Sequence, residues 1–182
     1  MNHVLKLSYP VAHSKVLPQI IKLKAKRSSF LEVMVMPKVK VNDIQIYYEV
    51  KGEGFPLVMI NGLGGNLDSW KNYHPLAEEL SRELKLVMFD NRGAGRTDIS
   101  DREYTIKLFA DDTAGLMNAL GISKAHILGI SMGGMIAQEL VLNYPEKVAK
   151  LVLWSTCSGG SEDVQSSSKV SRNLAATSKM SQ

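Results

Sequence analysis

The sequence predicts an α/β protein: a three-layer α/β/α sandwich whose mainly parallel sheet follows an N-terminal β-hairpin. Residues 39–50 alternate apolar and polar side chains on both sides of Asn42 and Asp43, a pattern typical of two strands joined by a two-residue turn. Beyond residue 54, short apolar runs alternate with longer amphipathic segments. Strands and helices in alternation give a parallel sheet with helices on both faces.

Residues 1–35 are predicted to be a basic extension outside this fold, because they contain two prolines and lack a regular helical or strand period. Residues 1–40 hold eight basic side chains and one acidic one, a net charge of +7, whereas the whole chain has +4 and the remainder therefore −3. Three explanations of the extension stay open. They are translation that starts at Met36, a disordered basic arm, and a targeting peptide, although transit peptides favour arginine over lysine.

Four apolar runs are predicted to form the interior strands of the sheet. Each is short and almost wholly apolar, as expected of parallel strands that are covered on both faces. The runs are 57–60, Leu84–Phe89, Ala125–Ile130 and Val148–Trp154.

Three segments between these runs are predicted to be helices. The first follows the glycine-rich residues 61–65 and extends to about residue 80, with Asp68 as its N-cap. The second covers residues 105–120, where apolar side chains recur on one face, and Gly121 ends it. The third covers residues 135–143 and stops before a proline.

Composition excludes several classes of protein. The 182-residue chain is long enough for one domain with a sizeable core, and no apolar run reaches the roughly 18 residues of a membrane span. The mildly acidic body offers no basic face for nucleic acid. A single cysteine, Cys157, excludes an intramolecular disulfide and a multi-cysteine zinc site, so we expect a reducing, cytoplasmic location and no metal or cofactor. The sequence predicts no oligomeric state.

The motif around which the chain is organised is Gly-x-Ser-x-Gly at Gly129, Ser131 and Gly133. It lies between an apolar strand-like run and a helix-like run, the arrangement of a nucleophile elbow. A serine in such a strained turn needs glycines two positions to either side, because neighbouring backbone leaves no room for a β-carbon. The same turn points the first amides of the following helix, including that of Met132, toward a developing oxyanion.

These residues resemble the α/β-hydrolase superfamily over about residues 36–160. Three motifs occur in the order of that family: a glycine-rich loop at 61–65, Asp-x-Arg-Gly-x-Gly at 90–95, and Gly-x-Ser-x-Gly-Gly at 129–134. The chain is most similar to the branch of esterases, lactonases and carbon–carbon bond hydrolases that includes 3-oxoadipate enol-lactonase. Residues 161–182, of which seven are serine, are then a serine-rich tail or the start of the cap of this fold.

The resemblance implies acyl chemistry on a small-molecule ester, lactone or related substrate. Ser131 would be the nucleophile, and the amides of Met132 and Leu63 would donate to the oxyanion. Asn61, Gly62 and Gly64 would contact the substrate. A purely structural role for these glycines in a tight turn remains an alternative.

The second loop, with Asp90, Arg92, Gly93, Gly95 and Asp98, is expected to shape the rim of the site through its glycines and its internal ion pairs. A direct role of a loop arginine in binding a substrate carboxylate is the weaker alternative.

The acid and histidine of a serine triad are not expected among these residues. In this fold they follow the serine, but no histidine follows Ser131, and Asp163, the one later aspartate, lies in the serine-rich tail. His126 is expected to be structural, as are the three earlier histidines His3, His13 and His74. The hypothesis is that the chain is the N-terminal part of a hydrolase, which would leave one edge of the last strand uncovered.

Two other functions compete with this one. A dinucleotide-binding module is suggested by Gly62 and Gly64 between a strand and a helix, but the third glycine of that pattern is replaced by Leu67, and the module leaves Ser131 unexplained. The other alternative is a catalytically inactive fragment or a binding subunit that depends on a partner.

Overall fold

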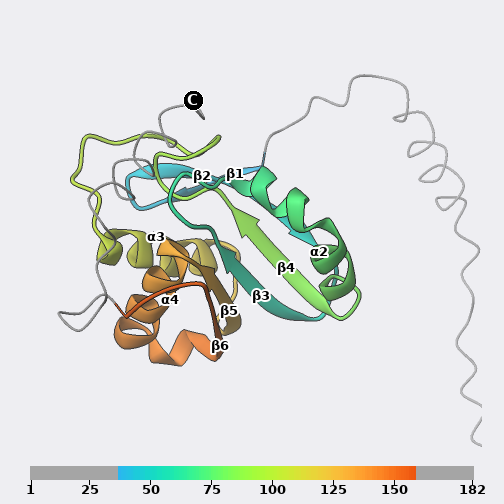
Figure 1. Ribbon diagram of the computed structural model, residues 1–182. Coiled ribbons are helices and arrows are strands. Elements are labelled where there is room, and N and C mark those ends of the chain that lie inside the picture. The colour runs from blue at the N-terminus through green and yellow to red at the C-terminus, as the bar shows by residue number, and fades with distance from the viewer. Residues whose placement is uncertain (1–36, 159–182) are drawn as a thin grey trace, which may run out of the picture. The chain divides into compact units, whose positions relative to one another are not determined.

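A computed structural model describes residues 37–158 of the chain, with only the backbone course given for residues 71–74. Six strands form one sheet in the order β1-β2-β4-β3-β5-β6 (Figure 1). The strands are β1 (Lys38–Val41), β2 (Ile44–Lys51), β3 (Phe55–Ile60), β4 (Leu84–Phe89), β5 (Ala125–Ile130) and β6 (Val148–Trp154). The predictions for residues 1–35 and 161–182 lie outside the described residues.

The hairpin and the parallel sheet are both confirmed. β1 and β2 pair antiparallel across a turn in which Asn42 has a φ of 51°. β2 joins β4 antiparallel, and β4, β3, β5 and β6 then run parallel to one another. β4, β5 and β6 begin and end at the predicted residues, while β3 begins two residues earlier than expected.

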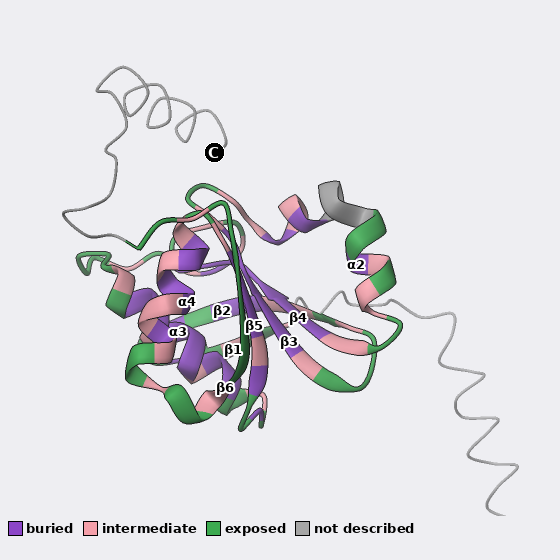
Figure 2. Ribbon diagram, turned by 60° about the horizontal axis from the view of Figure 1, so that its bottom comes forward, coloured by how far each residue is buried: buried purple, intermediate pink, exposed green. Residues whose placement is uncertain are grey.

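Helices cover both faces of the sheet (Figure 2). On one face α3 (Ile106–Ala119) and α4 (Met132–Asn143) bury an apolar cluster that includes Phe109, Leu116 and Ile136. On the other face a 3₁₀ helix (Leu67–Tyr73) and α2 (His74–Leu80) cover a second cluster around Trp70, Met88 and Leu128. A short 3₁₀ helix (Pro145–Lys147) precedes β6.

Two helix starts differ from the prediction. The first helical segment begins at Leu67 as a 3₁₀ helix, and Asp68 lies inside it rather than capping it. Asn66 is the cap, because its Oδ1 accepts a hydrogen bond from the Ser69 amide at 3.2 Å. α4 begins at Met132, three residues earlier than expected, because close packing against the sheet holds the intervening glycines in the helix.

α3 matches its prediction closely. Thr105 caps the helix, since its hydroxyl accepts a hydrogen bond from the Leu108 amide at 3.1 Å. Gly121 follows the last turn with a φ of 68°, the left-handed conformation that commonly ends a helix.

β6 is an edge of the sheet, and its apolar side chains are exposed. Leu151, Val152, Leu153 and Trp154 each expose between 37% and 47% of their surface. An apolar edge strand of this kind favours association through strand pairing. Among the described residues, no helix has the length and apolar character needed to span a membrane.

Candidate active site

Ser131 occupies a strained turn between β5 and α4. Its backbone has a φ of 54° and a ψ of −121°, a conformation that non-glycine residues rarely adopt. The Ser131 amide donates to the Trp154 carbonyl at 3.0 Å, and the Ser131 carbonyl accepts from the Thr156 hydroxyl at 2.7 Å. These two bonds fix the turn to the end of β6, and the Ser131 side chain is exposed.

Gly129 and Gly133, on either side of Ser131, allow the backbones of β3, β5 and α4 to approach one another closely. A β-carbon on Gly129 would collide with the carbonyl of Gly133, and one on Gly133 would collide with the carbonyl of Ile60 at the end of β3. Both carbonyls belong to the backbone, so they cannot relieve the collision by changing a side-chain rotamer. The turn therefore requires glycine at both positions, as the motif predicted.

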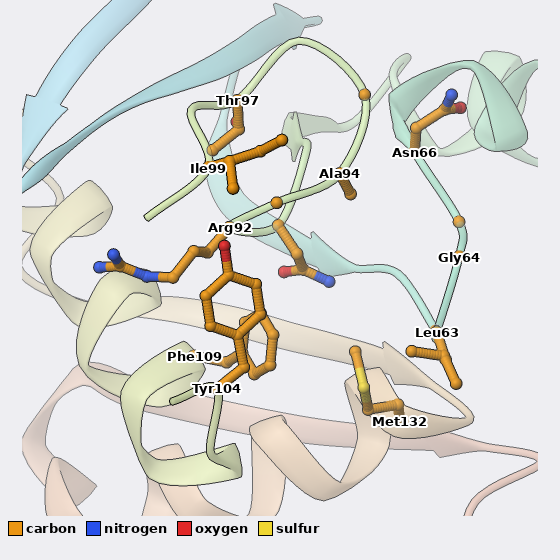
Figure 3. Close-up of a pocket in the computed structure, with 15 residues that line it drawn as sticks. Leu63, Gly64, Asn66, Arg92, Ala94, Thr97, Ile99, Tyr104, Phe109 and Met132 are labelled. Atoms are coloured by element: carbon orange, nitrogen blue, oxygen red, sulfur yellow. The ribbon is translucent and has the colours of Figure 1, made fainter. Parts of the chain in front are cut away.

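The loop after β3 reaches Ser131 directly. A β-carbon on Gly62 would lie 3.0 Å from the Cβ of Ser131 and 3.6 Å from its Oγ. Leu63 follows Gly62, and its side chain is 70% exposed. Figure 3 shows Leu63 and Met132, from different elements, on the same side of the pocket. The two expected oxyanion donors thus come from the two segments that meet at Ser131.

A cavity of about 590 Å³ opens beside these two residues. Of the residues predicted for the site, Gly62 and Gly64 line it, whereas Asn61 and Ser131 do not. The sequence did not mark the other lining residues below as site residues. Asn66 comes from the loop after β3, and the others come from the loop after β4 and the start of α3: Asn91, Ala94, Thr97, Ile99, Tyr104 and Phe109.

Asn61 holds the glycine-rich loop after β3 in place through hydrogen bonds. Its side chain is buried, and its Nδ2 donates to the Asn66 carbonyl at 2.9 Å. Its own carbonyl accepts from Nδ2 of the buried Asn91 at 3.1 Å. The two loops are therefore held together by side-chain amides that span the glycine-rich segment.

Asp90 makes a second connection between the loops. It is fully buried, and its carboxylate accepts from the Leu67 amide and, at 2.8 Å, from the Arg96 amide. Gly95, with a φ of 52°, passes so close to this carboxylate that a β-carbon would collide with it. The expected role of the loop in shaping the site thus has a structural basis in Asp90.

The guanidinium of Arg92 is fully paired with side chains of the protein. All five of its N–H groups donate: to Asp112 at 2.7 and 2.8 Å, to Asp43 at 2.8 and 2.9 Å, and to Ser100 at 2.9 Å. The bonds to Asp112, and then those to Asp43, raise the pKa of Arg92 above its usual value. In return, the bonds from Arg92 lower the pKa of Asp43 from 3.8 to about 2.

Among the residues whose side chains the structure describes, His126 is the one histidine. The His126 ring, on β5, packs against Phe55 with ring centroids 4.7 Å apart, consistent with a structural role. His126 is five residues from Ser131 along an extended strand, which corresponds to about 16 Å. Among the described residues, no group of three histidine, cysteine, aspartate or glutamate side chains is arranged to hold a metal ion.

The fold and the turn at Ser131 define the class of this protein. Residues 56–177 match the family model described as alpha/beta hydrolase fold, so the chain belongs to that family. The resemblance predicted from the three motifs is therefore confirmed.

Individual relatives are hydrolases. A candidate carbamate hydrolase of Azorhizobium caulinodans is 34% identical over 129 residues, which cover 68% of this chain and 47% of that protein. A 2-hydroxymuconate semialdehyde hydrolase of a Pseudomonas species is 36% identical, over 56% of this chain and 36% of its own length. The solved enol-lactonase of Burkholderia xenovorans is 30% identical with a TM-score of 0.62, over 66% of this chain and 46% of its own. The chain thus spans less than half the length of each of these relatives.

The Asp43–Arg92 pair should make stability depend on pH in acid. Because the folded pKa of Asp43 is depressed, its contribution is complete above the ordinary value of 3.8 and is lost as the pH falls toward about 2. We expect the melting temperature of the wild type to exceed that of Asp43→Asn by a constant margin down to about pH 4, and the margin to shrink below it. A margin that does not change with pH, measured by circular dichroism, would contradict this assignment.

The neighbouring residues Asp111 and Asp112 provide a matched test of the buried network. Asp112→Asn should cost about 3 kcal/mol of unfolding free energy, because it weakens the partner of a fully buried guanidinium. Asp111→Asn should cost less than about 1 kcal/mol, since its lysine partner is half exposed and the amide oxygen of asparagine can still accept from the Tyr144 hydroxyl. Urea unfolding of both variants measures the difference, and equal costs would show that the Arg92 network is not a special contributor.

Proposed function

We propose that this chain carries the nucleophile and the oxyanion site of a serine hydrolase that acts on a carboxylic ester, a lactone or a related acyl substrate. Residues 36–160 form the hydrolase core in this proposal. The observation that carries it is the strained backbone of Ser131, held between β5 and α4 directly beside Gly62. Such strain persists only where the surrounding structure maintains it, and it clusters at reactive sites.

The geometry supports nucleophilic attack on a carbonyl carbon. As Ser131 Oγ bonds to the carbon, negative charge develops on the carbonyl oxygen, which needs preorganised donors. The amide of Met132 is in the first turn of α4, where amides have no acceptor within the helix. The amide of Leu63 is the second proposed donor. Collapse of the adduct expels the leaving group and leaves an acyl-enzyme, which water then hydrolyses.

Two of the relatives reported above support acyl chemistry in this proposal. Their names include an enol-lactonase and a 2-hydroxymuconate semialdehyde hydrolase. Serine at the turn also favours an acyl-enzyme over the alkyl ester that an aspartate nucleophile forms. The proposal assigns the general base and the orienting acid to no described residue.

A second candidate function is that of an inactive fragment or a binding subunit that depends on a partner. It is favoured by one observation, that the described histidine, His126, packs on Phe55 and is remote from Ser131. A serine triad that lacks its base loses about a millionfold in turnover. Binding in the cavity would survive such a loss.

Reaction with a fluorophosphonate separates these candidates, because the probe forms an adduct with an activated serine. We expect one adduct per wild-type chain, located at Ser131 by mass spectrometry, and none in Ser131→Ala. Ser155→Ala is the matched control, since Ser155 is also exposed, ends the neighbouring strand and has a φ of 48°. It should react like the wild type.

Hydrolysis of p-nitrophenyl acetate by the same three proteins then measures turnover. Adduct formation without turnover above the Ser131→Ala background would favour the binding function. A folded wild type that forms no adduct would contradict the proposed nucleophile.

A further inference from the structure

We infer that the cavity beside Ser131 selects an uncharged acyl group and discriminates against one that bears a carboxylate. This inference rests on the proposed function, because it concerns the substrate of the same site. It follows from how the cationic side chains near the cavity are paired.

Arg92 is the only charged residue among the described residues that line the cavity. Its side chain has no exposed surface, and each of its five N–H groups already donates to Asp43, Asp112 or Ser100. Figure 3 shows its guanidinium pointing away from Met132 and Leu63. A substrate carboxylate could bind Arg92 only by displacing an existing aspartate.

Arg96, from the same loop, is also engaged. Its guanidinium lies 4.0 Å from the centroid of the Tyr47 ring, and it pairs with Asp68 at 3.2 Å and with Asp90 at 3.5 Å. Its backbone amide donates to the buried Asp90 as well. This arginine therefore serves to neutralise Asp90.

The charges beside the cavity leave a negative excess. Arg92 pairs with two carboxylates, those of Asp43 and Asp112, and Arg96 pairs with two others. Arg102 also pairs with Asp43, at 3.6 Å, so the cluster around Arg92 has no net charge, whereas Arg96 with its two carboxylates has a net charge of −1. A carboxylate entering the cavity would lose hydration, and Arg92, the charged residue that lines it, has no N–H group left to donate to it.

The remaining lining suits a neutral group. Leu63, Ile99, Phe109 and Met132 supply apolar surface, and uncharged polar side chains complete the wall. The Thr97 hydroxyl is already used twice, since it accepts from the Tyr47 amide and donates to the Asp90 carbonyl. The wall can therefore solvate an ester or an alkyl chain better than an anion.

A pair of ligands that differ by one methyl group and one charge tests the inference: dimethyl succinate and monomethyl succinate. Each is titrated into the full-length Ser131→Ala protein, so that no turnover is needed, and binding is followed by the amide resonances of Gly64, Gly93 and Met132. We expect the neutral diester to bind at least about tenfold more tightly than the anion, which corresponds to about 1.4 kcal/mol. Equal or tighter binding of the monoester would overturn the inference, as would the absence of any shift with the diester.

Two charge variants, made in the Ser131→Ala background, identify the source of the preference. Asp43→Asn removes one carboxylate from Arg92 and should reduce the preference for the diester several-fold. Asp111→Asn removes the same charge beside Lys107 and should leave the preference unchanged. If both variants reduced the preference equally, the preference would come from the net charge of the protein. That result would overturn the role of the Arg92 cluster.

The result of this binding experiment can be distinguished from the result of the adduct experiment that tests the proposed function. Ligand binding to Ser131→Ala does not require a reactive serine, whereas adduct formation by the wild type does. A protein that forms the Ser131 adduct but binds both esters alike would refute only the inference on charge.

Discussion

The close approach of three backbones at Gly129 and Gly133 is the constraint on which the site depends. α4 can begin directly after Ser131 only because its first turn rests against the ends of β3 and β5 without intervening β-carbons. This approach fixes the left-handed backbone of Ser131 and brings the Gly62 loop beside it. The proposed nucleophile and its proposed oxyanion donors are thus positioned by packing, before any substrate is present.

Buried polar groups maintain this arrangement from the other side of the cavity. Asp90 and Asn91 connect the loop after β4 to the loop after β3, and the Arg92 network fixes the same loop to α3 and to the hairpin turn. Breaking one partner of such a network leaves a buried charge or amide unpaired, which costs much more than the bond contributes. Because the hydrogen bonds that stabilise the loop after β4 also occupy every N–H group of Arg92, the proposed selectivity depends on the same contacts as the stability of the loop.

The sequence predicted the sheet and the elbow well, because both depend on local pattern. Apolar runs between turn residues determined the bounds of β4, β5 and β6, and the glycines around Ser131 indicated the strained turn. Prediction was wrong for the N-cap at Asp68, because Asn66, two residues earlier, directly precedes the helix and accepts from its Ser69 amide. The roles of Asn66 and Asn91 in the cavity could not be predicted, because they depend on contacts between loops that are distant in sequence.

The central claim is that the amides of Leu63 and Met132 share one oxyanion bound to Ser131. The most direct test is the ¹⁵N–¹H spectrum of the full-length protein before and after phosphonylation of Ser131. The account predicts that both amide protons move strongly downfield on forming the adduct, because each then donates to the phosphoryl oxygen, while the amide of Gly121 at the far end of α3 stays in place. An adduct on Ser131 that leaves the Leu63 and Met132 amides unshifted would contradict the account.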